Sequence, residues 1–263
     1  MKRIKNILII LLALAFHLFL TTPLFGGTDG ETHSLFFMVM SGIDPDMGAC
    51  ARRLCLGAMD FVIIGVAMLL MHPAKEIFGE LGLARRTCLR GLAIGFLLTL
   101  PMFITNAVCG KFTFTWETLF LSFWAGFYEE ILFRGFLFGQ LFRSGRLGFF
   151  TAILLPSLLF GMCHLYQAND LMSALLTVAV TALDSLLFGW LYVEWNYSLW
   201  VPMSLHAFMD LSWTLFPVGV GGYGATGNIT VNIGRAITVI LAVVITIMNK
   251  KKQGRKCFDY KKF

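Results

Sequence analysis

The chain has 263 residues, of which 57% are hydrophobic and only 14% are charged, and its mean hydropathy is +0.76. A soluble domain carries close to a quarter charged residues, so this composition excludes a soluble protein and indicates an all-α polytopic membrane protein. The net charge of +6 could suggest nucleic-acid binding, but the basic residues flank apolar segments or lie in the tail 250–262. No nucleic-acid partner is therefore expected, and the basic residues are expected to mark the cytoplasmic side of a lipid bilayer.

The apolar segments predict a single bundle of about eight transmembrane helices. One span needs about 20 residues, so little of the chain remains for a soluble domain. In chain order the predicted helices are 4–20, 54–71, 89–106, 117–140, 148–165, 171–193, 197–216 and 233–248.

Loop charges predict the orientation. A basic N-terminus precedes the apolar run 7–20 as in a signal peptide, but no small-x-small cleavage site follows, so the first segment is expected to be an uncleaved span. With the N-terminus inside, most basic connections face the cytoplasm, with Arg52 and Arg53 as the only basic pair out of place. Both termini are then predicted to be cytoplasmic. Six cysteines show no metal-ligand spacing, and a disulfide between Cys50 and Cys55 is left open.

Three charged residues interrupt the fourth segment: Glu129, Glu130 and Arg134. An ionised residue at the centre of a span costs roughly 2.5 to 3.5 kcal/mol, so these residues require a protein interior or a water-filled cavity. In a helix, Glu130 and Arg134 share a face, whereas Glu129 is rotated by about 100°. We expect Glu130 to neutralise Arg134 while Glu129 stays free. The alternative is that all three form one buried structural network.

Histidines in two later segments accompany these acids. Phe160 and His164 are four residues apart, and the turn 143–148 lies midway between Glu129 and His164, so the two side chains are expected to meet at a similar depth. His206 and Asp210 are also four apart and share a face, after Pro202, which can kink the helix.

Other polar residues are expected to be less informative. His17 and His72 near helix ends and His33 in a loop are expected to be solvated or interfacial. Asp60 and Asp184 are further intramembrane acids, and for Asp184 a cavity wall or a polar contact between helices is expected.

The segments 129–135, 160–164 and 206–210 resemble the ordered motifs EExxxR, FxxxH and HxxxN/D of the CPBP family of intramembrane proteases, which includes CAAX prenyl endopeptidases and the bacterial Abi proteins. The resemblance covers about 116–216. It implies peptide hydrolysis in a membrane cavity by a glutamate-dependent mechanism, in which Glu129 and His164 activate a water and His206 with Asp210 stabilises the oxyanion. Supporting roles fall to Glu130, Arg134 and Phe160. The expected organisation is one structural domain, with N-terminal helices in 1–115, the catalytic core in 116–216, and the last helix and tail in 217–263.

Position 210 departs from the stricter pattern, because the Asn of many members can donate a hydrogen bond and an ionised Asp can only accept. Either Asp210 is protonated, or it orients and charges His206, which is the preferred interpretation. Metal-independent catalysis is favoured. Zinc remains the alternative, as in a metalloprotease, because Glu129, His164, His206 and Asp210 are all competent ligands although no HExxH motif is present.

The resulting hypothesis is an intramembrane endopeptidase whose substrate is a membrane protein or peptide; prenylation of that substrate is not assumed. A second class is a non-hydrolytic membrane protein, such as a bacteriocin self-immunity factor or scaffold. A third class, an ion or proton transporter, is disfavoured because the polar groups gather at one site and the sequence has no inverted repeat.

Overall fold

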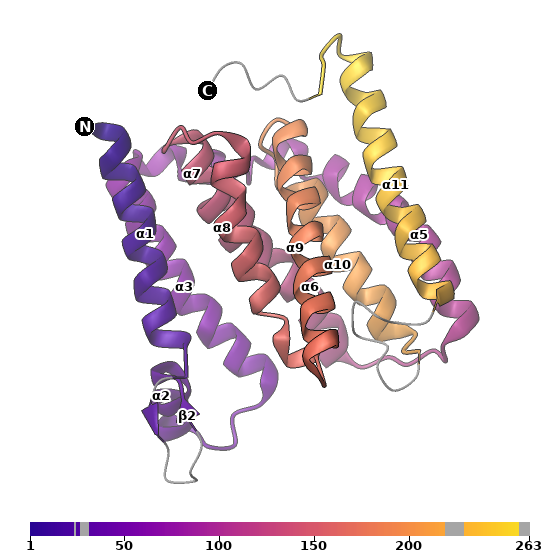
Figure 1. Ribbon diagram of the computed structural model, residues 1–263, viewed down its shortest axis with the longest axis horizontal. Coiled ribbons are helices and arrows are strands. Elements are labelled where there is room, and N and C mark those ends of the chain that lie inside the picture. The colour runs from indigo at the N-terminus through magenta and orange to yellow at the C-terminus, as the bar shows by residue number, and fades with distance from the viewer. Residues whose placement is uncertain (24, 27–31, 219–228, 258–263) are drawn as a thin grey trace. The chain divides into compact units, whose positions relative to one another are not determined.

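The computed structural model describes residues 1–23, 25–26, 32–218 and 229–257, and these are built almost wholly of helices (Figure 1). The chain divides into two compact units, Met1–Ile77 and Phe78–Phe263. The grouping into 1–115, 116–216 and 217–263 as one structural domain stays a prediction. The glycine-rich stretch 219–227 before the last helix lies outside the described residues.

The first unit is a pair of antiparallel helices with short elements between them. Its elements are α1 (Lys2–Thr21), β1 (Phe25–Gly26), β2 (Thr32–His33), α2 (Leu35–Ile43), α3 (Ala49–Met71) and η1 (Ala74–Glu76), followed by α4 (Ile77–Glu80) at the boundary. The two strands pair antiparallel over two residues each. Cys50 and Cys55 at the start of α3 are both free, so the disulfide that the sequence left open is not formed.

The helices α1 and α3 are joined by polar contacts. His17 Nδ1 lies 2.6 Å from Asp60 Oδ1, and only 1% of Asp60 is exposed. The expectation that His17 is solvated is therefore wrong, whereas its position relative to the membrane interface stays a prediction. A buried carboxylate needs a partner, and the antiparallel packing of α1 on α3 brings this histidine to it.

The second unit contains the remaining helices of the part of the chain that the structure describes. They are η2 (Arg85–Thr87), α5 (Cys88–Cys109), α6 (Trp116–Glu129), η3 (Glu130–Phe138), α7 (Gly139–Arg143), α8 (Phe149–Met162), η4 (Leu165–Gln167), α9 (Leu171–Glu194), α10 (Trp200–Leu215) and α11 (Ile229–Lys252). α10 packs against both α5 and α6, α8 packs against α9, and α11 packs against α5.

Two glycines allow α10 to lie close to its neighbours. A Cβ built on Gly126 of α6 would lie 2.6 Å from the backbone nitrogen of Ala207, and one built on Gly95 of α5 would lie 2.4 Å from Ser204 Oγ. Small residues at such crossings let helix backbones approach each other within a bilayer. Hydrogen bonds from Asn106 to Ser212 (2.8 Å) and between Ser122 and Thr214 (3.0 Å) hold α10 further to α5 and α6.

The all-α polytopic fold is confirmed. Within the described ranges, six helical segments are long and apolar enough to cross a membrane, by length and composition: Lys2–Thr21, Ala49–Met71, Ala74–Cys109, Phe149–Gln167, Leu171–Glu194 and Ile229–Lys252. The other two predicted spans are helical as well, but they differ from uniform apolar helices. The segment 116–143 changes from an α-helix to a π-helix at Glu130, and α10 has only 16 residues.

Candidate active site

The expected pair of Glu130 and Arg134 is present at the start of the π-helix η3. Arg134 Nη1 donates to Glu130 Oε1 over 2.8 Å, and neither side chain is exposed. The guanidinium also lies over the rings of Phe160, at 4.3 Å, and Phe188, at 5.2 Å. The buried guanidinium is thus stabilised by one carboxylate and two aromatic faces. Phe160 of α8 therefore supports the site by direct contact with Arg134.

Glu130 has a second partner that the sequence did not indicate. Its Oε1 atom lies 2.9 Å from His206 Nδ1 of α10, so one carboxylate oxygen accepts from both Arg134 and His206. A carboxylate can only accept, and therefore Nδ1 of His206 carries a hydrogen and donates it. The bond fixes the ring so that Nε2 points away from Glu130.

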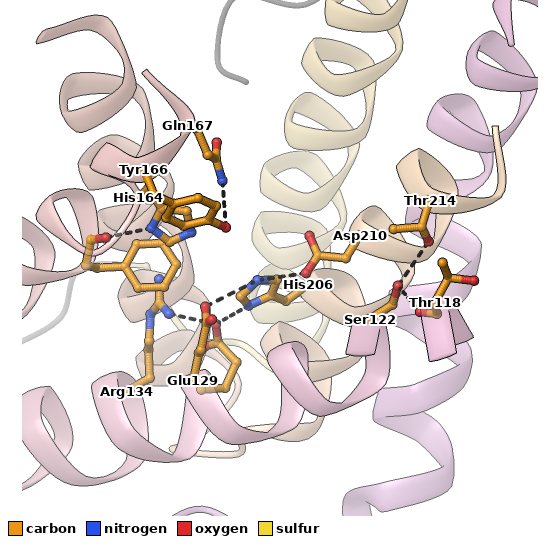
Figure 2. A network of polar contacts seen from close by, with 12 residues as sticks. Thr118, Ser122, Glu129, Arg134, His164, Tyr166, Gln167, His206, Asp210 and Thr214 are labelled. Atoms are coloured by element: carbon orange, nitrogen blue, oxygen red, sulfur yellow. Dashed lines mark hydrogen bonds and ion pairs between the residues drawn. The ribbon is translucent and has the colours of Figure 1, made fainter. Parts of the chain in front are cut away.

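The Nε2 atom of His206 faces two further carboxylates (Figure 2). It lies 3.5 Å from Asp210 Oδ2 and 3.8 Å from Glu129 Oε2. The expected pairing of His206 with Asp210 on one face of α10 is therefore present. His206 is nearly buried, with 10% of its side chain exposed, whereas the Glu129 and Asp210 side chains are 22% and 27% exposed. Three carboxylates around one imidazole favour its doubly protonated, cationic form.

His164 lies beside this group and does not bond to Glu129. The helix α8 ends at Met162, and His164 Nδ1 lies 2.7 Å from the carbonyl oxygen of Phe160, to which it must donate. Among the described residues, no hydrogen bond or ion pair joins His164 to Glu129, and the imidazole next to Glu129 is His206.

The ring of Phe160 connects the two histidines. Its centroid lies 4.6 Å from that of His164 and 6.2 Å from that of His206. Because Nδ1 of His164 donates to a carbonyl, its Nε2 is left as an acceptor when the ring is neutral. The cooperation of Glu129 with His164 stays a prediction.

Several buried polar atoms at the site have no hydrogen-bond partner within the described part of the protein. They are Oε2 of Glu129, Oε2 of Glu130, and Nε and Nη2 of Arg134. Leaving a buried donor or acceptor unsatisfied costs about 1 to 3 kcal/mol, so water or a polar ligand group is expected to bind such atoms. The site is therefore suited to hold a water next to a carboxylate.

Asp184 also has a partner that the sequence did not name. It forms an ion pair with Arg235 of α11, and this confirms the expected polar contact between helices. The guanidinium of Arg235 lies 5.5 Å from the ring centroid of Trp213 on α10. In the sequence, this pair could have been found as one acidic and one basic residue that each lie alone in an apolar segment.

The described residues contain no group of three or more His, Cys, Asp or Glu side chains arranged to hold a metal ion. The zinc alternative proposed for Glu129, His164, His206 and Asp210 is left to experiment.

Comparison with protein families matches residues 111–212 to the Rce1-like family, described as Type II CAAX prenyl endopeptidase Rce1-like. The matched segment is therefore similar to the CPBP/CAAX family. It contains Glu129, Phe160, His164, His206 and Asp210, so the three motifs and the family match fall on the same residues. No curated protein and no solved structure matches the chain.

The CPBP/CAAX match has two consequences at a coarse level. The family is a protease family, which supports a peptide hydrolase acting on a membrane-associated protein. Together with the apolar helices, it indicates a multi-pass membrane protein. Arg235 and the whole of α11 lie outside the matched segment.

Proposed function

We propose that the protein is an intramembrane endopeptidase that hydrolyses a peptide bond of a membrane-associated protein or peptide. The observation that carries the proposal is the position of Glu129. Its carboxylate is partly exposed, has one oxygen without a hydrogen-bond partner, and lies 3.8 Å from an imidazole that is already fixed by Glu130. A carboxylate in such a place can accept a proton from a bound water.

In the proposed mechanism Glu129 is the general base. The attacking water is held between Glu129 and the free Nε2 of His164, gives its proton to the carboxylate, and forms the new bond to the scissile carbonyl carbon. The tetrahedral oxygen then carries a negative charge. When the carbon–nitrogen bond breaks, the proton on Glu129 passes to the leaving amine, so that the carboxylate is regenerated.

His206 is proposed to stabilise the negatively charged oxygen. Its Nδ1 hydrogen is used by Glu130, and its Nε2 hydrogen faces the open side of the site near Glu129 and Asp210. Asp210 has no hydrogen to donate when ionised, so its role is to hold the cationic imidazole in place. A donor that is fixed before the reaction stabilises the transition state without a reorganisation cost.

The mechanism is proposed to need no metal, and both termini are proposed to be cytoplasmic. The match to a CAAX prenyl endopeptidase family supports a substrate that is attached to the membrane. Prenylation of the substrate is not part of the proposal.

The decisive experiment compares membrane peptides from cells that express the wild type, Glu129→Gln, or the control Glu117→Gln. Glu117 is an exposed residue at the start of α6 and has the same side chain. New peptide termini should appear with the wild type and the Glu117→Gln control and be absent with Glu129→Gln, and mass spectrometry would identify them. An identical set of termini for all three proteins would instead support a non-hydrolytic scaffold.

A further inference from the structure

Arg235 is the only charged residue of α11 before the basic end of the helix at Lys250. A charge within an apolar span costs roughly 2.5 to 3.5 kcal/mol and needs a compensating interaction. The Arg235 side chain is only 11% exposed, and it forms an ion pair with Asp184 of α9. This residue lies outside the segment that matches the family, so the family motifs assign it no role.

The position of Arg235 also relates it to the proposed active site. Its guanidinium stacks against Trp213, which lies three residues after Asp210 on the same side of α10. The guanidinium therefore packs against the side of α10 that also carries Asp210.

One continuous chain of contacts joins four charged residues, Arg134, Glu130, His206 and Asp210, and Arg235 forms a separate ion pair with Asp184. Glu130 binds both Arg134 and His206, His206 pairs with Asp210, and Arg235 packs on Trp213, three residues after Asp210.

We infer that Arg235 is a positioning residue for the proposed reaction: it balances the carboxylate of Asp210, so that Asp210 can hold His206. The inference rests on the proposed function and extends it to α11. The related motif accepts either Asn or Asp at this position. An Asn is neutral and needs no counter-charge, whereas a partly buried Asp that shares one imidazole, His206, with the carboxylates of Glu129 and Glu130 does. Arg235 supplies that charge from a helix that the motif does not include.

The competing role is purely structural, with Arg235 present only to attach α11 to α9 through Asp184. Two second-site substitutions distinguish these roles. Asp210→Asn removes the carboxylate that needs positioning, and Asp184→Asn removes the carboxylate of the attachment. If Arg235 positions Asp210, Asp210→Asn should reduce the effect of losing Arg235. If Arg235 only attaches α11, Asp184→Asn should do so instead.

The test uses Arg235→Gln alone, with Asp210→Asn, and with Asp184→Asn, together with both single Asn variants. The probe is an internally quenched peptide with the cleavage sequence found by comparing wild-type and Glu129→Gln membranes, and both kcat and KM are measured on purified protein in detergent. Arg235→Gln should lower kcat about tenfold or more with little change in KM. In the Asp210→Asn background the same substitution should lower kcat less than about threefold.

Two controls complete the design. Arg235→Lys keeps the charge and should retain most of kcat. Arg90 also stacks on a tryptophan, Trp195, at 5.8 Å, but it lies away from the site. The substitution Arg90→Gln should therefore leave kcat unchanged. Asp184→Asn should raise the melting temperature of Arg235→Gln without restoring kcat.

Rescue of kcat by Asp184→Asn and not by Asp210→Asn would overturn the inference, as would equal losses of kcat in both backgrounds. If no protein shows cleavage that depends on Glu129, the proposed function fails. The melting temperatures of the same proteins then still test whether Arg235 and Asp210 interact. Non-additive effects of Arg235→Gln and Asp210→Asn on the melting temperature would support the pairing, and additive effects would refute it.

Discussion

Glu130 is expected to serve both stability and catalysis, and the two contributions can be separated. Glu130→Gln keeps the side-chain volume but removes the charge that neutralises Arg134, which is fully buried. Removing one partner of a buried ion pair typically costs about 3 to 5 kcal/mol, because the other charge is left uncompensated. For a chain of this size we expect a fall in melting temperature of roughly 10 °C, measured by thermal unfolding in detergent.

The double variant Glu130→Gln/Arg134→Met removes both charges and fills the space below Phe160 and Phe188 with an apolar side chain. Replacing a whole buried pair by apolar groups is often neutral for stability, so the melting temperature should return towards that of the wild type. Cleavage should not return, since His206 still lacks the carboxylate that fixes its Nδ1. A single variant as stable as the wild type, or a stable double variant with normal cleavage, would refute the reasoning.

Two further outcomes are expected. Treatment with a strong chelator should leave cleavage by the purified protein unchanged, whereas loss of cleavage that zinc restores would establish the metal alternative at Glu129, His164, His206 and Asp210. Gly126→Val should lower the yield of folded protein and should lower the melting temperature by several degrees, because its Cβ would lie 2.6 Å from the Ala207 nitrogen. The matched control is Gly65→Val on α3, where nothing lies within 4 Å, and it should behave as the wild type.

Local spacing predicted the parts of the site that lie within one helix. The pairs Glu130 with Arg134 and His206 with Asp210 are both four residues apart, and both are in contact. The turn after Arg143 was also predicted, and it allows α8 to follow η3 and α7 as a hairpin, with Arg146 in the left-handed region at φ 50°. In these cases the geometry of a helix is sufficient to bring the residues together.

Contacts between helices could not be predicted in the same way. The bond from His206 to Glu130 joins residues 76 positions apart and depends on how closely α6 and α10 approach at Gly126. The pairing of His17 with Asp60 depends likewise on the packing of α1 on α3. Arg235 and Asp184 were detectable as unpaired charges, but only the position of α11 against α9 shows that they are partners.

The π-helix that begins at Glu130 connects the carboxylates of the site to α7 and its contacts with Glu80. The π-helix η3 runs into α7, where Arg143 forms an ion pair with Glu80 at 2.9 Å and Gln140 donates to the Glu80 carbonyl oxygen at 3.1 Å. Deleting one residue between 131 and 138 would turn everything after it by about 100° relative to Glu130, even if the segment remained helical. A deletion in this interval should therefore abolish function, and related sequences should show no alignment gap there. Most substitutions of one apolar residue by another in the same interval should leave the protein functional.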